Sequence, residues 1–417
     1  MQDSRTHILY IAEYSTGGSV ESLLCLVGGL DKNAFSATVL FTRMPDSAVC
    51  QRFETAGATI LSVFPQSKGE GTRKQLQKLD MQSKVRAALG RRIEGLYESL
   101  KFALHYLRFR RPVYKATVRI INQVQPDLIH LNNGIVGDMS GIRAAHACRV
   151  AAVCHIRNFR KLPPLSVRAS RPVSMFVCIS GAVRDHLVEY GVNAHRCIVI
   201  PNAVDPVRFN EAAISTDGLR EEFGWNSSHK VFALVGRLVS WKGQDYFLKA
   251  IAKARNSDIS IRGLIVGDAD PSSVHTDYID SLKSLAGKLG IEDSVTFAGH
   301  RTDIAKIMKS ADGVICASSD PEPFGRVIIE SMAVGTPAIA TNAGGAADII
   351  TDGVDGLLVP IRDSAALAKA MLRLSGDDSF AQDMRTAAMQ TVAERYTEKR
   401  HVARVCDVYR TVLESKT

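Results

Sequence analysis

Two glutamates, Glu322 and Glu330, stand in the stretch SSDPEPFGRVIIESMAVGTPAIATNAGG at residues 318–345. An apolar, strand-like run precedes the stretch, and Phe324-Gly325-Arg326 has the character of a helix start. Exposed backbone N–H groups at a helix start bind phosphate, and a glycine there lets a ligand approach the backbone. Carboxylates accept hydrogen bonds from hydroxyl groups. We therefore expect a ligand that carries both phosphate and hydroxyl groups.

The spacing of the two glutamates fits a nucleotide-sugar. Eight helical residues rise ~12 Å, roughly the reach from a sugar across a diphosphate to a ribose. The alternative for Glu330 is a buried salt bridge, and the alternative for Glu322 is a solvated loop residue. The two glutamates by themselves do not exclude these alternatives.

Two cations follow an earlier strand pattern, VFALVGRL. Arg237 comes directly after Gly236, and Lys242 precedes an expected helix that begins near Gln244. Arginine can bind phosphate oxygens through two parallel hydrogen bonds, and lysine supplies a point charge. Taken alone, the pair reads as surface cations. Together with the glutamate stretch, it indicates an anion site in which cations of the protein can take the place of a divalent ion.

The elements that must position these side chains are strands that alternate with helices. Near-continuous apolar runs predict parallel strands covered on both faces. The fold class is therefore α/β, with two doubly wound domains whose ligands bind outside the carboxyl ends of the strands. A loop-like passage places the boundary near residue 205, which gives domains at 1–205 and 206–394. The strand runs are HILYIAE, ATVLFT, TILSVF, DLIHLN, AAVCHIR, MFVCIS and CIVIPNAV in the first half, and VFALVGRL, SIRGLIVGD, VTFAG, GVICAS, AIAT and GLLV in the second.

Composition narrows the class of protein. Of 417 residues, 46% are hydrophobic and 23% charged, which is typical of globular domains. The N-terminal apolar run is too short for a signal peptide, and no window approaches a membrane span. The eight cysteines lack C-x-x-C spacing, so we expect reduced thiols rather than zinc or disulfides. These features predict a cytoplasmic protein.

A basic segment at residues 66–119 holds fourteen Lys and Arg against four Asp and Glu, an excess that accounts for the whole net charge of +9. Between Val85 and Leu107, apolar residues recur at helical spacing and predict a helix with its apolar face toward the core. The alternative is a surface for anionic lipid or an anionic acceptor at the inner face of the membrane. Both can hold if the cations face the membrane. Nucleic acid is not expected, because no aromatic strand platform or finger spacing accompanies the charge.

Taken as an ordered set, the motifs resemble those of the retaining glycosyltransferases of family four, the group 1 glycosyltransferases with the GT-B fold. The resemblance rests on Gly17-Gly18, SGAVRDHL, VIPNAVDPVRF, VGRLVSWKGQDYFLKAI, IVGDADP, FAGHR and the glutamate stretch. It implies two Rossmann-like domains facing across a cleft, with a C-terminal helix at about residues 395–417 packed back on the first. It also implies retaining transfer of a hexosyl-type sugar from a UDP- or GDP-sugar to an acceptor hydroxyl. The acceptor would be a glycolipid or lipid-linked glycan in bacterial surface polysaccharide or lipopolysaccharide assembly.

The resemblance assigns roles residue by residue, with no metal and no cofactor besides the nucleotide-sugar substrate. Arg237 and Lys242 correspond to the diphosphate pair, Glu322 faces the donor sugar, and His155 lies near the hydroxyls of that sugar. The alternative for His155 is a hydrogen-bonded core residue, which is the role we expect for His130. The donor-binding residues implied are Gly17, Gly18, Gly236, His300, Arg301, Pro323, Phe324, Gly325, Arg326 and Glu330.

Two other functions fit the same paired domains. A nucleotide-sugar 2-epimerase would act on the donor without an acceptor, and a catalytically degenerate protein would bind the nucleotide-sugar without turnover. A nicotinamide-linked dehydrogenase is disfavoured, because no G-x-G-x-x-G follows the first strand.

Overall fold

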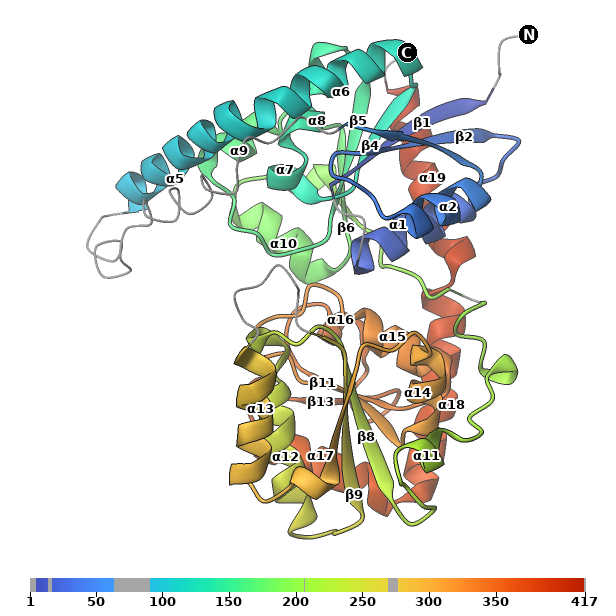
Figure 1. Ribbon diagram of the computed structural model, residues 1–417. Coiled ribbons are helices and arrows are strands. Elements are labelled where there is room, and N and C mark those ends of the chain that lie inside the picture. Colours follow the sequence, from blue (N-terminus) through green and yellow to red (C-terminus); the bar gives the residue numbers. More distant parts are fainter. Residues whose placement is uncertain (1–4, 14–16, 64–90, 206, 269–276, 416–417) are drawn as a thin grey trace. The chain divides into compact units, whose positions relative to one another are not determined.

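A computed structural model describes residues 5–13, 17–63, 91–205, 207–268 and 277–415 (Figure 1). The chain divides into two compact units: Met1–Ile200 with His401–Thr417, and Pro201–Arg400. Compared with the boundaries expected from the sequence, residues 201–205 and 395–400 belong to the second unit.

The first unit is built on a seven-stranded parallel sheet in the order β3-β2-β1-β4-β5-β6-β7. The order reverses between β1 and β4, which makes the carboxyl ends of these strands the switch point of the sheet. Its strands are β1 (Thr6–Ala12), β2 (Phe35–Phe41), β3 (Ala58–Ser62), β4 (Leu128–Leu131), β5 (Ala151–Ile156), β6 (Met175–Cys178) and β7 (Cys197–Val199). Its helices include α1 (Gly18–Gly28), α2 (Ser47–Thr55), α5 (Arg91–His105), α6 (Arg111–Val124), α7 (Gly134–Gly137), α8 (Met139–Ala147), α9 (Pro164–Ala169) and α10 (Gly181–Glu189).

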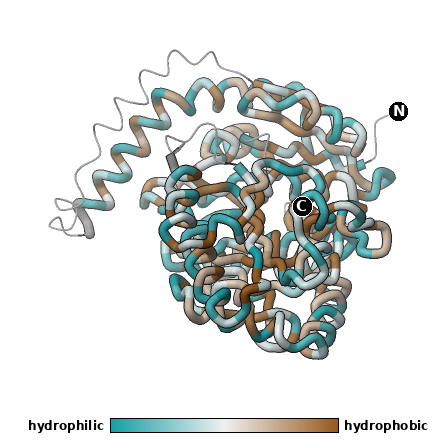
Figure 2. Tube along the Cα trace, turned by 60° about the horizontal axis from the view of Figure 1, so that its bottom comes forward, coloured by the Kyte–Doolittle hydropathy of each residue, from teal (hydrophilic) through white to brown (hydrophobic). Residues whose placement is uncertain are grey.

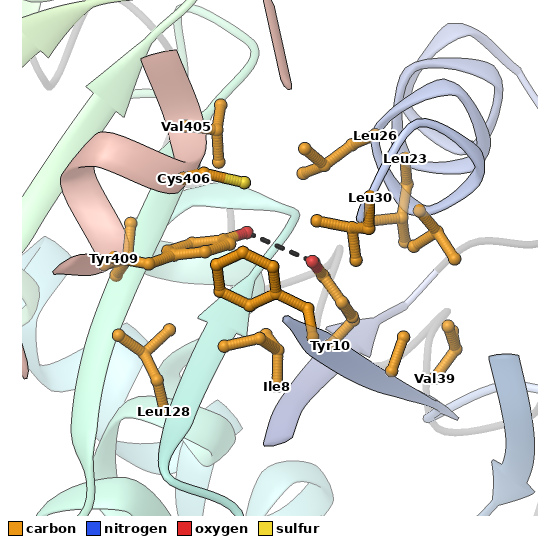
Figure 3. Packing of buried hydrophobic residues seen from close by; sticks show 14 of the residues in the cluster. Ile8, Tyr10, Leu23, Leu26, Leu30, Val39, Leu128, Val405, Cys406 and Tyr409 are labelled. Atoms are coloured by element: carbon orange, nitrogen blue, oxygen red, sulfur yellow. Dashed lines mark hydrogen bonds between the residues drawn. The ribbon is translucent and has the colours of Figure 1, made fainter. Parts of the chain in front are cut away.

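The last helix of the chain, α19 (Glu398–Glu414), completes the core of the first unit. Its apolar positions recur three and four residues apart and pack with α1 and the strands β1 and β4 (Figure 3). Tyr409 is fully buried there, and its hydroxyl lies 3.3 Å from that of Tyr10. Because burying one large apolar side chain contributes about 1.5–3 kcal/mol, this helix is an integral part of the unit.

The second unit is a six-stranded parallel sheet in the order β10-β9-β8-β11-β12-β13, with its switch point between β8 and β11. Every apolar run expected to form a strand does so, and the α/β fold class is confirmed. Its strands are β8 (Lys230–Val235), β9 (Ile261–Val266), β10 (Val295–Gly299), β11 (Gly313–Cys316), β12 (Ala338–Thr341) and β13 (Leu357–Val359). Its helices are α11 (Leu219–Glu222), α12 (Gln244–Arg255), α13 (Asp277–Lys288), α14 (Ile304–Ser310), α15 (Arg326–Ala333), α16 (Ala346–Ile349), α17 (Ser364–Gly376) and α18 (Asp378–Arg395).

The helix of the basic segment presents its apolar side outward, so the expectation of a core-facing apolar stripe is wrong for its described part. Four leucines form an exposed ridge, with exposed fractions of 50–71%: Leu96, Leu100, Leu104 and Leu107. The polar side faces the protein instead, because Glu94 pairs with Lys161 at 2.5 Å and the Ser99 hydroxyl accepts from a backbone N–H of α9. Residues 66–90 of the segment, and with them the expected apolar positions Val85 and Leu89, lie outside the described ranges.

The segment continues from α5 through a π-helical turn, Tyr106–Arg110, into α6, so that the three form one long rod (Figures 1 and 2). Val113, Thr117 and Ile121 anchor α6 to the unit, while α5 carries the leucine ridge. Among the helices that the structure describes, none has the length and apolar character to cross a bilayer.

Candidate functional site

The carboxyl edge of the second sheet is tied together by backbone hydrogen bonds between consecutive strand ends. The Gly236 N–H donates to the Val266 carbonyl at 2.9 Å, and the Gly267 N–H donates to the Gly299 carbonyl at 2.8 Å. The ends of β8, β9 and β10 are thereby held in register. Arg237 lies two residues after the end of β8 and is exposed to solvent at this edge.

Lys242 and Glu322, which the sequence separates by 80 residues, meet at this edge. The Lys242 Nζ lies 2.7 Å from Glu322 Oε2, and the two side chains are only 17% and 9% exposed. The Ser318 hydroxyl donates to the same oxygen at 2.8 Å. An anion that binds Lys242 must therefore compete with, or sit beside, a carboxylate that already holds the cation in place.

Glycine makes the close packing around Glu322 possible. At Gly344, φ is +67°, and a Cβ atom there would lie 2.2 Å from the carbonyl oxygen of Glu322. The neighbouring Gly345 N–H donates to that same oxygen at 2.7 Å. Gly325 has φ of +94° and begins α15 without a side-chain cap, so the first N–H groups of the helix have no capping side chain. These glycines explain why the segment 318–345 can fold so tightly.

Glu330 lies on the second turn of α15, as expected, but it is also part of an ion pair. Arg326 Nη2 donates to Glu330 Oε1 at 2.7 Å within the helix, and the two side chains are 18% and 13% exposed. Glu330 therefore takes part in the salt bridge that the alternative interpretation predicted. A ribose hydroxyl would have to bind Glu330 beside Arg326.

The other implied donor residues on this unit lie in the segments that follow β10 and β11. Phe324 is buried and packs edge-on against Tyr396. Pro323 is half-buried and His300 is exposed. The guanidinium of Arg301 is held between Glu222 and Asp303, and this pairing raises the pKa of Arg301 and lowers that of Asp303.

Three implied residues lie on the first unit. Gly17 caps α1 with φ of +91°, and Gly18 is the first residue of that helix. His155 is fully buried near the end of β5, where burial, Arg157 and neighbouring histidines hold its pKa well below the ordinary value. His130 is buried as expected and contacts both His155 and Tyr409.

Sequence reasoning missed the groups that orient these side chains. Ser318 fixes Glu322, and the amide of Gln244 donates to the carbonyl oxygen of Arg237 at 2.9 Å. Ser318 follows the end of a strand and Gln244 begins a helix, and these positions at the carboxyl edge of the sheet could have identified them from the sequence. In the described ranges, no three His, Cys, Asp or Glu side chains come close enough together to hold a metal ion.

Two family models match the chain. The one described as Glycosyltransferase Family 4 matches residues 16–208, and the one described as Glycosyl transferases group 1 matches residues 215–391. The chain belongs to this glycosyltransferase family. The matches cover the two units separately, one model on each.

Curated relatives are similar in sequence to parts of this chain. D-inositol 3-phosphate glycosyltransferase of Corynebacterium urealyticum is 34% identical over 232 residues, which cover 54% of each chain. Glycosyltransferase EpsD of Bacillus subtilis is 27% identical over 320 residues, which cover 73% of this chain and 82% of that protein. The matched regions span about half or less of several relatives, at 54%, 38% and 42% of their lengths.

Solved structures extend the likeness to almost the whole chain. Anabaena HepE in complex with UDP and glucose has a TM-score of 0.78 at 23% identity, covering 98% of this chain and 100% of that one. WaaG, described as a glycosyltransferase involved in lipopolysaccharide biosynthesis, has a TM-score of 0.65 at 14% identity, with 95% and 99% covered. The family member therefore has the GT-B fold, with two Rossmann-like domains.

Proposed function

We propose that the protein is a retaining glycosyltransferase that moves a hexosyl-type sugar from a UDP- or GDP-sugar to an acceptor hydroxyl. The observation that carries the proposal is the Lys242–Glu322 pair beside the uncapped start of α15, at the switch point of the second sheet. That position is where doubly wound domains bind nucleotides. Support also comes from HepE, whose structures contain UDP and UDP-glucose.

In this proposal, cations of the protein stabilise the departing diphosphate and no metal is needed. Lys242, paired with Glu322, and the N–H groups that follow Gly325 are held in place by the fold, so they need not reorganise as negative charge develops, and Arg237 adds a second cation at the same edge of the sheet. Glu322 and Glu330 bind hydroxyls at the sugar and ribose ends. No protein nucleophile is required when the acceptor attacks from the face that the diphosphate leaves and a diphosphate oxygen takes the acceptor proton.

The leucine ridge of α5 supports a lipid-linked acceptor at a membrane surface. Exposed cations continue along the same rod at Arg108, Arg111, Lys115 and Arg119. Apolar side chains can enter the interface while each nearby cation contributes about 1 kcal/mol toward anionic lipid. We place the protein at the inner face of the cytoplasmic membrane, in surface polysaccharide or lipopolysaccharide assembly.

Donor turnover distinguishes the proposal from its two rivals. UDP- and GDP-sugars are first screened by thermal shift, and the stabilising donor is then incubated with and without candidate lipid-linked acceptors. Mass spectrometry should find a glycosylated product only with acceptor, and NMR should find the α-anomer from an α-linked donor. An epimerised donor without acceptor favours the epimerase, and binding without any turnover favours the degenerate protein.

Flotation with lipid vesicles tests the membrane placement separately. Leu96→Ser with Leu100→Ser should reduce binding to vesicles that contain phosphatidylglycerol, and Val188→Ser on α10 provides the matched exposed apolar control. Binding that ignores both the leucine changes and the anionic lipid would contradict the placement. UDP binding should be unchanged in both variants.

A further inference from the structure

A short turn of the second unit packs against the segment that follows β11. The turn is a 3-10 helix, Ser240–Lys242, that precedes α12. The Trp241 carbonyl oxygen accepts hydrogen bonds from the backbone N–H of Ser319 at 2.8 Å and from its hydroxyl at 3.4 Å. Gly243 has φ of +73°, and a Cβ atom there would collide with the carbonyl oxygen of the residue after β11. The fold therefore fixes the backbone of Trp241 at the carboxyl edge of the sheet.

The indole ring of Trp241 is a second partner of the Lys242 ammonium. Lys242 Nζ lies 4.4 Å from the centroid of the ring and 2.7 Å from Glu322 Oε2. A cation over the face of a tryptophan ring is attracted by the electron-rich face, most strongly where water is excluded. The Lys242 side chain is 17% exposed, so water screens this attraction only in part.

The two partners of Lys242 act differently on an approaching anion. The Glu322 carboxylate carries a full negative charge, so it offsets the charge of the ammonium and repels a phosphate group. The indole ring has no net charge, so it can hold the ammonium in place without neutralising it. If a diphosphate competes with Glu322 for the cation, the contact with the ring can persist while the ion pair is exchanged.

Position, rather than the type of contact, distinguishes Lys242. Lys249 also lies over an aromatic ring, 4.7 Å from the centroid of Tyr246, and pairs with Asp245. Those three residues lie on α12, where the helical repeat brings such groups together. Lys242 instead contacts a residue 80 positions away, after the strands β8 and β11 that form the switch point of the sheet. Doubly wound domains bind their ligands at such a point.

We propose that Trp241 is a positioning residue for the donor diphosphate. The face of its ring keeps the Lys242 ammonium at the carboxyl edge while the diphosphate replaces Glu322 as the anion that the ammonium contacts. Without the ring, the flexible four-carbon stem would spread the ammonium over several rotamers, and the ligand would have to order it on binding. The role in binding rests on the proposed function, whereas the contact between ring and ammonium does not.

Proton–carbon NMR of the full chain labelled with ¹³Cε-lysine tests the contact directly. The ring current of the indole should shift the Hε signals of Lys242 upfield from those of exposed lysines, and Lys242→Arg identifies these signals by their loss. Trp241→Leu should abolish the shift, and Trp241→Phe should keep part of it. Saturation with UDP should leave the wild-type signals upfield, because the ammonium stays on the ring when the anion is bound.

The affinity for UDP, measured by isothermal titration calorimetry, provides the second readout. Trp241→Leu should weaken UDP binding about fivefold, the scale of a partly desolvated contact between a cation and an aromatic face. Trp241→Phe keeps such a face and should bind UDP within about twofold of the wild type. Tyr246→Leu is the matched control, because it removes the ring from Lys249 and should leave the affinity unchanged.

Lys242 Hε signals without an upfield shift in the wild type, or signals that move to the position of an exposed lysine when UDP binds, overturn the proposal. Equal UDP affinity of Trp241→Leu and the wild type does so too, as does a Trp241→Phe variant that binds as weakly as Trp241→Leu. Upfield signals in a protein that binds neither UDP nor GDP would instead overturn the proposed function, and the binding role with it. If Trp241→Leu does not fold, the wild-type signals with and without UDP decide.

Discussion

Replacing Lys242 by alanine should weaken both the fold of the second unit and the binding of UDP. The change leaves Glu322 buried with the Ser318 hydroxyl as its remaining side-chain donor. Removing one partner of a buried ion pair costs about 3–5 kcal/mol. Because the two side chains are 17% and 9% exposed, water relieves part of this cost, and we expect a loss of about 2–3 kcal/mol in the free energy of unfolding.

Lys249→Ala is the matched control for this experiment. Lys249 also pairs with a carboxylate, Asp245, but the two side chains are 38% and 28% exposed on the surface of α12. Such a helical pair contributes about 0.3–0.5 kcal/mol. Urea unfolding of both variants, followed by fluorescence, measures the difference between the buried and the exposed pair.

The same unfolding curves recorded with UDP measure the contribution of Lys242 to binding. A ligand at 100 times its Kd stabilises the folded state by about 2.7 kcal/mol. Loss of one charge-assisted hydrogen bond, worth about 1.5–3 kcal/mol, should remove most of this gain from Lys242→Ala and none from Lys249→Ala. Equal effects of the two substitutions on stability and on UDP binding would refute the reasoning.

Three further predictions follow from particular contacts. Glu330→Ala should reduce turnover of the UDP- or GDP-sugar severely while the free energy of unfolding falls by about 2–3 kcal/mol, as for the similarly buried Lys242–Glu322 pair; near-normal turnover would exclude a ribose-binding role. Gly344→Ala should lower the free energy of unfolding by about 3 kcal/mol or more, because its Cβ would lie 2.2 Å from the Glu322 carbonyl oxygen. Gly353→Ala, also at positive φ but in open space, should lower it by about 1–2 kcal/mol. Equal losses of the two variants in urea unfolding would contradict this. Burial raises the pKa of Asp138 to about 7 in the folded state, so the folded state binds this proton more tightly than the unfolded state and stability falls as pH rises from about 4 to 7. Between pH 5 and 8, the free energy of unfolding of the wild type should fall by about 2–3 kcal/mol more than that of Asp138→Asn. Parallel pH profiles of the two proteins would show that Asp138 is ionised throughout.

The strands and the glutamate-bearing helix could be predicted because their signals are local. Apolar runs identify buried strands one at a time, and Phe324-Gly325-Arg326 marks the start of the helix. The ~12 Å helical rise expected between Glu322 and Glu330 is wrong, because α15 begins at Arg326 and Glu322 lies four residues before it. The apolar stripe of α5 could be identified in the same way. Its direction could not, because Glu94 and Ser99 find their partners at Lys161 and at Leu165 of α9, 67 and 66 residues further along the chain.

The order of motifs along the sequence determined the family and the α/β fold, because periodicity and motif spacing are visible without any knowledge of tertiary contacts. Tertiary structure alone decided which polar side chains meet: Lys242 with Glu322, Arg301 with Glu222, and Tyr409 with His130. Each of these pairs joins elements far apart in sequence, and their geometry depends on how parallel strands bring their carboxyl ends to one edge and how the last helix packs on the first sheet. A hydrogen bond is set by separations of a few tenths of an ångström, and only the packed fold defines positions that closely.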